Sequence, residues 1–430
     1  MIGETKVHDV CIVGAGPAGS TAAWYLAGAG RNVLLLEKAA FPRDKLCGDA
    51  ICANAQKHLR RMGVLEQILD RNQGLWISSG GFVSPGGRRC IGDATSLTKG
   101  ALVIAIERII LDEYVARAAQ AAGAHLLEHS PVSSVEFSKT DRQWTVNCGP
   151  QTHQTHRARV LVLADGAQSA LARSLGLVRT APDAICSRGA VRAPAADFPE
   201  QGVMYYPEHL LPGYIALLRH VDGLLHCSTY ILPGGRAVPG DLRRLHHQLL
   251  REDPLVSRAV GPGAEILKMQ GAWLRLGGVR PSYFDHLLLV GDAAGQIDPL
   301  TGEGIQYAMD AAELAAQTLD EALAANDFSA RFLRRYEDRW MRAFGRDFYW
   351  SQKIADMQTR HPWLLEAGAA LIERQGLPFL AHYGEIMTGL RPKSDFLKPS
   401  MAWPTLREVV FQAVNRWRQA KSAQPAEASR

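Results

Sequence analysis

The segment that decides the fold is Val10-Cys11-Ile12-Val13-Gly14-Ala15-Gly16-Pro17-Ala18-Gly19. Its apolar start is typical of a buried strand, and the small residues from Ala18 to Ala29 predict a helix. A second apolar strand follows at Val33–Leu36. This strand–helix–strand order predicts a βαβ unit with a parallel sheet.

The glycines of this segment have separate expected roles. Gly14 would make a tight turn, Gly16 would let the backbone approach a pyrophosphate, and Gly19 would let the helix pack on the strand. The helix start would offer free N–H groups and the positive end of its dipole to the phosphates. Glu37, which follows the second strand, is placed to accept hydrogen bonds from ribose hydroxyls. A glycine-tolerant turn in an ordinary α/β domain is the alternative, and the context favours a dinucleotide site.

Two later segments place aspartate and glycine directly after a buried strand. They are Ala164-Asp165-Gly166-Ala167 and Val290-Gly291-Asp292-Ala293. The second leads into Asp298-Pro299-Leu300-Thr301-Gly302-Glu303-Gly304-Ile305, where a long helix is expected to begin. Each aspartate alone could merely cap a turn. Ligands of open α/β sheets bind at the carboxyl ends of strands, so the three segments together favour one elongated ligand.

In order and spacing, the three segments resemble the single-component FAD-dependent oxidoreductases of the p-hydroxybenzoate hydroxylase fold. That superfamily includes aromatic monooxygenases, flavin-dependent halogenases and geranylgeranyl reductases. The resemblance covers about residues 8–325 and implies bound FAD, with NAD(P)H as a transient reductant. It implies that Asp292 holds the ribityl chain and that Arg108 lies near the FAD. For Arg108, an exposed charge at a helix start is the open alternative. The expected FAD-binding residues are Gly14, Gly16, Ala18, Gly19, Glu37, Lys38, Arg108, Asp165, Gly166, Gly291, Asp292, Pro299, Gly302, Glu303, Gly304 and Ile305.

One further segment resembles the geranylgeranyl reductase branch. Phe41-Pro42-Arg43-Asp44-Lys45-Leu46-Cys47-Gly48-Asp49 matches its Pro-x-x-Lys-x-Cys-Gly signature. Cys47 and Lys45 are the candidate catalytic residues, because Lys45 could lower the pKa of the Cys47 thiol and make it reactive. The alternative is that Cys47 is a small packing residue beside a tight turn.

The strands expected to cover the flavin depart from that branch. Gly213-Tyr214-Ile215-Ala216-Leu217-Leu218-Arg219-His220 corresponds to the Tyr-x-Trp-x-Phe-Pro motif of the lipid reductases but lacks its tryptophan and proline. Tyr214, Arg219 and His220 are the substrate-side candidates. No Trp-x-Trp occurs in the chain, which disfavours halogenation.

The predicted fold class is α/β, with a Rossmann-type FAD-binding domain interleaved with an antiparallel-sheet substrate domain and followed by a C-terminal helical region. The FAD-binding domain is expected at 1–185 and 274–330, with 50–105 partly on the substrate side. The substrate domain is expected at 186–273, with a hairpin turn at Asp222-Gly223. Helices are expected at 331–421, and a disordered tail at 422–430.

The C-terminal helices carry an aromatic stripe. Phe332, Tyr336, Trp340 and Phe344 recur every four residues and so share one helix face. Most such stripes are core, which is the favoured interpretation. A lid over the substrate channel, suited to a large substrate, is the alternative.

Composition narrows the class of protein. The net charge of +5 over 430 residues is too small and diffuse to indicate a nucleic-acid groove. The seven cysteines lack metal-ligand spacing, so no metal is expected, and their odd number favours reduced thiols in the cytoplasm. We expect no signal peptide and no transmembrane segment.

The functional prediction is a monooxygenase that uses NAD(P)H and O2 to hydroxylate an aromatic substrate. A large or protein-borne substrate, such as a tryptophan side chain presented by a partner protein, stays open. The first alternative is a geranylgeranyl-reductase-like enzyme that saturates carbon–carbon double bonds. The second is a non-catalytic flavoprotein that acts as an assembly factor or redox sensor. The oligomeric state is not indicated.

Overall fold

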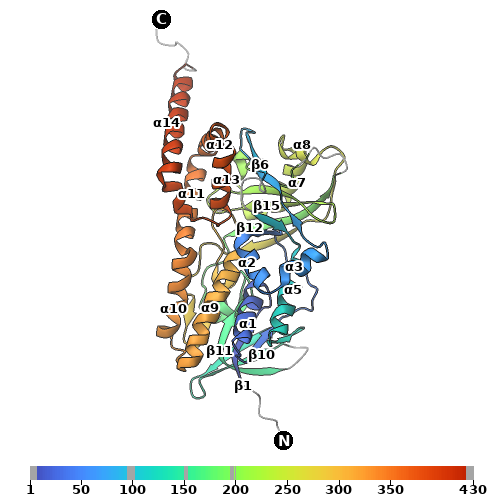
Figure 1. Cartoon of the computed structure of the whole chain (residues 1–430), viewed down its shortest axis with the longest axis vertical. Helices are drawn as coiled ribbons and strands as arrows, with labels where there is room; N and C mark the ends of the chain where they lie inside the picture. The colour runs from blue at the N-terminus through green and yellow to red at the C-terminus, as the bar shows by residue number, and fades with distance from the viewer. Residues whose placement is uncertain (1–6, 94–101, 150–153, 194–197, 199, 423–430) are drawn as a thin grey trace.

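The computed structural model describes residues 7–93, 102–149, 154–193, 198 and 200–422 (Figure 1). The tail predicted at 422–430 lies outside the described residues, except for Ser422, which ends the last helix. Within the described ranges, no helix combines the length and the apolar character needed to cross a bilayer.

The first sheet is the expected parallel one. Its strands lie in the order β18-β19-β11-β1-β2-β8, and beyond this path β10 pairs antiparallel with β11 and β9 pairs antiparallel with β10. The bounds are β1 (Val7–Val13), β2 (Val33–Leu36), β8 (His125–Leu127), β9 (Val132–Ser138), β10 (Gln143–Cys148), β11 (Thr155–Leu163), β18 (Tyr283–Phe284) and β19 (Leu287–Leu289). Because both faces of this part of the sheet are covered, β2 is apolar throughout and β1 is apolar from Val10 to Val13.

One face of this sheet carries three helices, α1 (Pro17–Gly28), α5 (Arg108–Ala121) and α9 (Ile305–Ala325). Alanines of α1 and α9 pack against each other and against the buried strands. The other face is covered by β9 and β10, whose Trp144 is buried and donates to the His286 carbonyl at 2.8 Å. The predicted βαβ unit and the predicted long helix that begins at Ile305 are confirmed.

The second sheet has the order β16-β12-β15-β14-β13-β5-β6, with β17 paired to β12. The bounds are β5 (Ser79–Val83), β6 (Arg89–Asp93), β12 (Ala184–Arg192), β13 (Gly202–Tyr205), β14 (Tyr214–Arg219), β15 (Leu225–Ile231), β16 (Glu265–Ile266) and β17 (Gln270–Leu274). The expected hairpin joins β14 to β15, and Asp222 accepts from the Leu224 N–H at 2.9 Å. The sheet is not wholly antiparallel, because β13 and β5 pair in parallel.

Several smaller elements were not predicted. Helices α7 (Leu242–Glu252) and α8 (Val256–Val260) lie between β15 and β16 in the chain. The leucines of α7 and the valines of α8 are buried in the core of the second sheet. Residues 50–105 supply β5 and β6 to that sheet. They also form a three-stranded sheet in the order β3-β7-β4. The remaining bounds of this part are β3 (Ala50–Cys52), α2 (Ala53–Arg61), α3 (Val64–Asp70), β4 (Leu75–Trp76) and β7 (Val103–Ala105). The short helix α6 (Ala170–Ser174) follows β11.

The C-terminal region is helical, as expected. It comprises α10 (Ala330–Trp340), a π-helical turn (Met341–Gly345), α11 (Arg346–Arg360), α12 (Trp363–Gln375), α13 (Leu377–Met387) and α14 (Pro399–Ser422). Tyr336 and Trp340 are fully buried against α9, and the Tyr336 hydroxyl donates to the Leu289 carbonyl at 3.1 Å. The aromatic stripe is therefore core, and the lid interpretation of the stripe is wrong.

Candidate functional site

The glycine turn after β1 leaves no room for a side chain. Gly14 has φ +101°, and a Cβ there would lie 2.5 Å from the Ala164 carbonyl oxygen at the end of β11. A Cβ on Gly19 would lie 1.9 Å from the Gly14 carbonyl oxygen. The close approach of β1, β11 and α1 therefore requires both glycines. Among the described residues, no side chain caps the start of α1 after Gly16, so its first N–H groups stay available to an anion.

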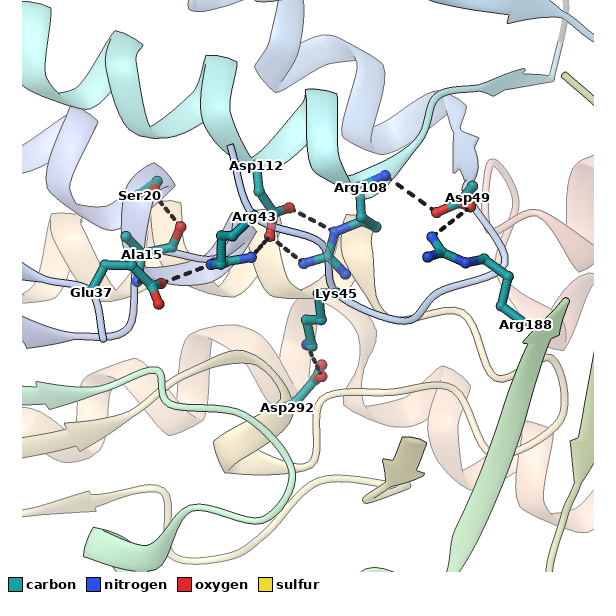
Figure 2. Close-up of polar contacts among 10 residues, drawn as sticks. All are labelled: Ala15, Ser20, Glu37, Arg43, Lys45, Asp49, Arg108, Asp112, Arg188 and Asp292. Carbon is teal, nitrogen blue, oxygen red and sulfur yellow. Dashed lines mark hydrogen bonds and ion pairs between the residues drawn. The ribbon is translucent and has the colours of Figure 1, made fainter. Parts of the chain in front are cut away.

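Two guanidinium groups face this helix start. A Cβ placed on Gly16 would find only the Nη2 atoms of Arg43 and Arg108 nearby, each at 4.0 Å. Arg108 donates to both oxygens of Asp112, at 2.6 and 2.7 Å, and Arg43 donates to Asp112 at 2.6 Å (Figure 2). Arginine forks and free helix N–H groups are the donor set that pyrophosphate prefers in proteins. The cradle thus fits the phosphates of a dinucleotide.

Buried charge pairing holds the two arginines in place. Arg108 is only 3% exposed, so it is not the exposed helix-start charge that was the alternative. Burial alone would raise the pKa of Asp112, but Arg108 and Arg43 outweigh it and the pKa is lowered. Sequence reasoning missed Arg43 and Asp112. The four-residue spacing of Arg108 and Asp112 on a predicted helix was the available signal.

Glu37 lies at the predicted place, at the end of β2. Its Oε2 accepts from the Ala15 N–H at 3.2 Å and from Arg43 Nη2 at 3.0 Å. Its carboxylate is thereby tied both to the glycine turn and to the arginine pair. Lys38, by contrast, is exposed and does not line the cavity described below.

The second and third segments end on the same side of the sheet. Asp165 follows β11, and its buried Oδ1 has no hydrogen-bond partner within the described chain. An unpartnered buried oxygen fits a site that a ligand hydroxyl would complete. Asp292 follows β19 and forms an ion pair with Lys45 at 2.9 Å.

The segment that contains Glu303 is braced from two directions. Asp298 accepts from the N–H groups of Leu300 and Thr301, at 2.8 and 3.1 Å, and forms a fully buried ion pair with Lys393 at 3.4 Å. Lys393 comes from the C-terminal region, which therefore helps to shape this loop. On the other side, the Tyr214 hydroxyl donates to the Thr301 carbonyl.

The Cys47 loop crosses in front of the second sheet. Gly48 is required there, because a Cβ would lie 2.5 Å from the Tyr230 hydroxyl. Burial raises the pKa of the Cys47 thiol, although nearby Arg108 opposes the shift. The Lys45 ammonium forms an ion pair with Asp292 instead, at 2.9 Å. The expectation that Lys45 makes Cys47 a thiolate is therefore wrong for this structure.

One cavity joins these segments. Of the predicted residues it is lined by Gly16, Ala18, Lys45, Cys47, Arg108, Gly166, Asp292, Gly302, Gly304 and Ile305. The second sheet adds Cys186, Tyr230 and Trp273, which sequence reasoning missed because the facing of those strands was unknown. Tyr214 is the cross-strand neighbour of Tyr230 on β14, and the two rings stack with centroids 4.6 Å apart.

Two of the three substrate-side candidates lie elsewhere. Arg219 is five residues beyond Tyr214 on the same strand, so it points to the opposite face and donates to the Phe198 carbonyl. His220 follows the end of β14 and stacks on His226 at 3.8 Å, away from the cavity. Burial, and then His226, lower the pKa of His220 to about 4.

In the described part of the chain, two groups of three side chains place their possible ligand atoms close enough together to bind a metal ion. They are Asp49–His220–His226 and His58–Asp310–Glu313. In both groups the carboxylates already pair with protein cations, Asp49 with Arg188 at 3.2 Å and Asp310 with Lys57 at 2.6 Å. That no metal is bound stays a prediction.

Comparison with known proteins agrees with this geometry. Residues 7–343 match the FAD binding domain family. Conditioned medium factor receptor 1 of Dictyostelium discoideum is 46% identical over 429 aligned residues, covering 97% of this chain and 84% of that protein. Digeranylgeranylglycerophospholipid reductase 2 of Methanopyrus kandleri is 31% identical over 413 residues, covering 91% and 97%.

A solved structure shares the fold. The geranylgeranyl bacteriochlorophyll reductase-like protein of Thermoplasma acidophilum superposes with a TM-score of 0.73 at 20% identity, covering 90% of this chain and 97% of that one. The family match includes the glycine turn, the Arg108 helix and the loop that contains Glu303. The chain belongs to the FAD binding domain family, among the FAD-dependent oxidoreductases of the p-hydroxybenzoate hydroxylase fold.

Proposed function

We propose that this oxidoreductase saturates carbon–carbon double bonds in the isoprenoid chain of a lipid, with NAD(P)H as the reductant. The observation that carries the proposal is the half-buried carboxyl group of Glu303, which lies between two glycines that line the cavity. Saturation of a double bond requires one hydride and one proton. Bound FAD supplies the hydride chemistry, so the chain itself must supply the proton and the apolar surroundings.

Glu303 is the proton donor in this proposal. Burial raises its pKa to about 7. The Cys52 thiol donates to one of its oxygens at 3.7 Å, and the Gln306 N–H donates to the other at 3.2 Å. Its neighbours Gly302 and Gly304 both line the cavity. A general acid works best when its pKa lies near the working pH.

The walls of the cavity favour a hydrocarbon. Tyr230, Trp273, Leu274 and Ile297 contribute aromatic and aliphatic surface to the lining of the cavity. Such a wall excludes water from the reacting carbons and offers few competing hydrogen bonds. The Methanopyrus relative is named as a reductase of geranylgeranyl lipids, and its similarity extends over nearly the whole chain. That similarity outweighs the missing Tyr-x-Trp-x-Phe-Pro motif.

Aromatic hydroxylation is the second candidate. The observation that favours it is the stack of Tyr214 on Tyr230 at the cavity wall, a surface on which a planar substrate could pack. It would require O2 as a second substrate.

For either activity we propose the cytoplasm as location, because all seven cysteines are free thiols.

Anaerobic turnover distinguishes the candidates. The FAD-loaded protein is mixed with NAD(P)H and a geranylgeranylated lipid in detergent without oxygen, and products are read by mass spectrometry. A gain of two hydrogens per reduced bond supports the proposal. Turnover only with oxygen, and a gain of one oxygen atom, refutes it in favour of hydroxylation. The Dictyostelium relative is named as a receptor, so no turnover under either condition would favour a binding role.

The role of Glu303 has its own test. Glu303→Gln should slow double-bond reduction by roughly 10²–10⁴-fold. In the unsubstituted protein the rate should fall as the pH rises through about 7, because the carboxyl then loses its proton. The variant should lack that pH dependence. Glu136→Gln, at an exposed site on β9, is the matched control and should leave the rate unchanged.

A further inference from the structure

The last helix presents apolar side chains to solvent. Figure 1 shows α14 extending beyond the other helices at one end of the long axis. On it, Trp403, Leu406, Val410, Val414 and Trp417 are 64, 55, 53, 41 and 58% exposed. Exposed tryptophans and branched aliphatic residues in such number are unusual for a surface helix unless the surface has a partner.

These five residues form one stripe. Their spacing of three or four residues confines them to an arc of about 80° around the helix axis, over a length of about 21 Å. The opposite face carries Met401 and Glu408, which are 3% exposed, and the helix packs there on α12. The stripe is therefore turned away from the body of the protein.

Charge distinguishes between possible partners. Arg407 and Arg418 are exposed at the edge of the stripe. The sequence of α14 contains one acidic residue, Glu408, and its carboxylate is buried in an ion pair with Arg374 at 2.6 Å. A second copy of the helix would bring arginine against arginine, with no exposed carboxylate on α14 to pair with them. An anionic surface would complement both the arginines and the apolar stripe.

We propose that α14 lies on the surface of a lipid bilayer rich in anionic headgroups. Its apolar stripe enters the boundary between headgroups and acyl chains, and its arginines stay among the phosphates. Trp403 and Trp417 at the two ends of the stripe are the residues that prefer this boundary. Such docking would present the enzyme to an isoprenoid lipid in the membrane. Membrane binding by α14 depends only on its apolar stripe and its arginines, and not on the proposed activity.

Vesicle sedimentation tests the proposal. The full FAD-loaded chain is mixed with vesicles of phosphatidylcholine alone or with phosphatidylglycerol, and the bound fraction is measured against lipid concentration. We expect binding to the anionic vesicles that weakens as salt is raised. Leu406→Glu combined with Val410→Glu should weaken it by at least about tenfold. Arg407→Gln should weaken it roughly fivefold, and only on anionic vesicles.

The controls separate the outcomes. Val238→Glu, at a residue 52% exposed outside α14, should leave vesicle binding unchanged. Unaltered binding of the Leu406/Val410 variant would overturn the proposal. So would a vesicle-independent dimer, seen by sedimentation equilibrium, that the same variant dissociates. The reductase assay in detergent reads the activity without a bilayer, so a failure of the proposed function would leave this result untouched.

Discussion

Replacing Asp112 by asparagine removes the negative charge that holds both arginines of the cradle. The change keeps the size of the side chain. Arg43 keeps the Glu37 carboxylate, whereas Arg108 loses the carboxylate to which it donates twice. Asp112 is fully buried and the Arg108 side chain is 4% exposed, so water cannot replace the lost partner. We therefore expect a large decrease in the free energy of unfolding, while the two guanidinium groups that would bind the phosphates are retained.

The size of the loss follows from the burial of the pair. Removing one partner of a buried ion pair costs about 3–5 kcal/mol, and here two guanidinium groups share the carboxylate. That is a substantial part of a typical stability of about 5–15 kcal/mol. The pKa of Asp112 is lowered in the folded state, so its contribution is present above the unfolded value of about 3.9 and is lost as the pH falls below it.

Urea unfolding at several pH values is the assay. The midpoint of Asp112→Asn should lie well below that of the unsubstituted protein at pH 7, and the gap should close below about pH 4. FAD should still bind the variant, because Arg43 and Arg108 remain. At about 100 times its dissociation constant, FAD should then stabilise the variant by about 2.7 kcal/mol. Arg43→Met should lose FAD affinity instead. Equal midpoints at pH 7 would refute the ion-pair account.

Three further predictions concern other parts of the site. Iodoacetamide should label Cys47 in the folded protein more slowly than a free thiol, because burial raises the pKa of the Cys47 thiol. Peptide mass spectrometry measures the labelling, and labelling at the rate of the unfolded chain would contradict this prediction. Gly19→Ala should weaken FAD binding by at least about tenfold, because its Cβ would lie 1.9 Å from a backbone oxygen, whereas Gly28→Ala in the same helix has open space and should be harmless. Lys393→Met should destabilise the protein by about 3–5 kcal/mol and so lower its unfolding midpoint, because the buried charge of Asp298 would lose its partner. An unchanged midpoint would show that the ion pair does not stabilise the loop.

Local patterns predicted the elements that depend on neighbours in sequence. The glycine turn, the helix at Arg108 and the β14–β15 hairpin all follow from residues within about twenty positions of one another. Each rests on a backbone requirement, such as the positive φ of Gly14, that few residue types can meet.

Contacts between distant segments escaped prediction. The pairing of Arg43 with Asp112 joins residues 69 positions apart, and no spacing rule connects a loop to a later helix. Tyr230 lines the cavity because β15 lies behind the Cys47 loop. Which face of the sheet the Tyr230 side chain points to depends on the register of β15, and that register is set by strand pairing across the whole sheet. Helix α7 was overlooked although its leucines recur at helical spacing, because the strands around it dominated the pattern.

Titration of the flavin-free protein with FAD, FMN and riboflavin tests the central claim, that three distant segments converge on one elongated dinucleotide. Flavin fluorescence and absorbance report the stoichiometry and the affinity. The geometry predicts one FAD per chain and much weaker binding of FMN, because the glycine turn, Glu37 and the arginine pair would then have no pyrophosphate or adenosine to hold. Equal affinity for FMN and FAD, or a protein that stays colourless in excess FAD, would contradict the account.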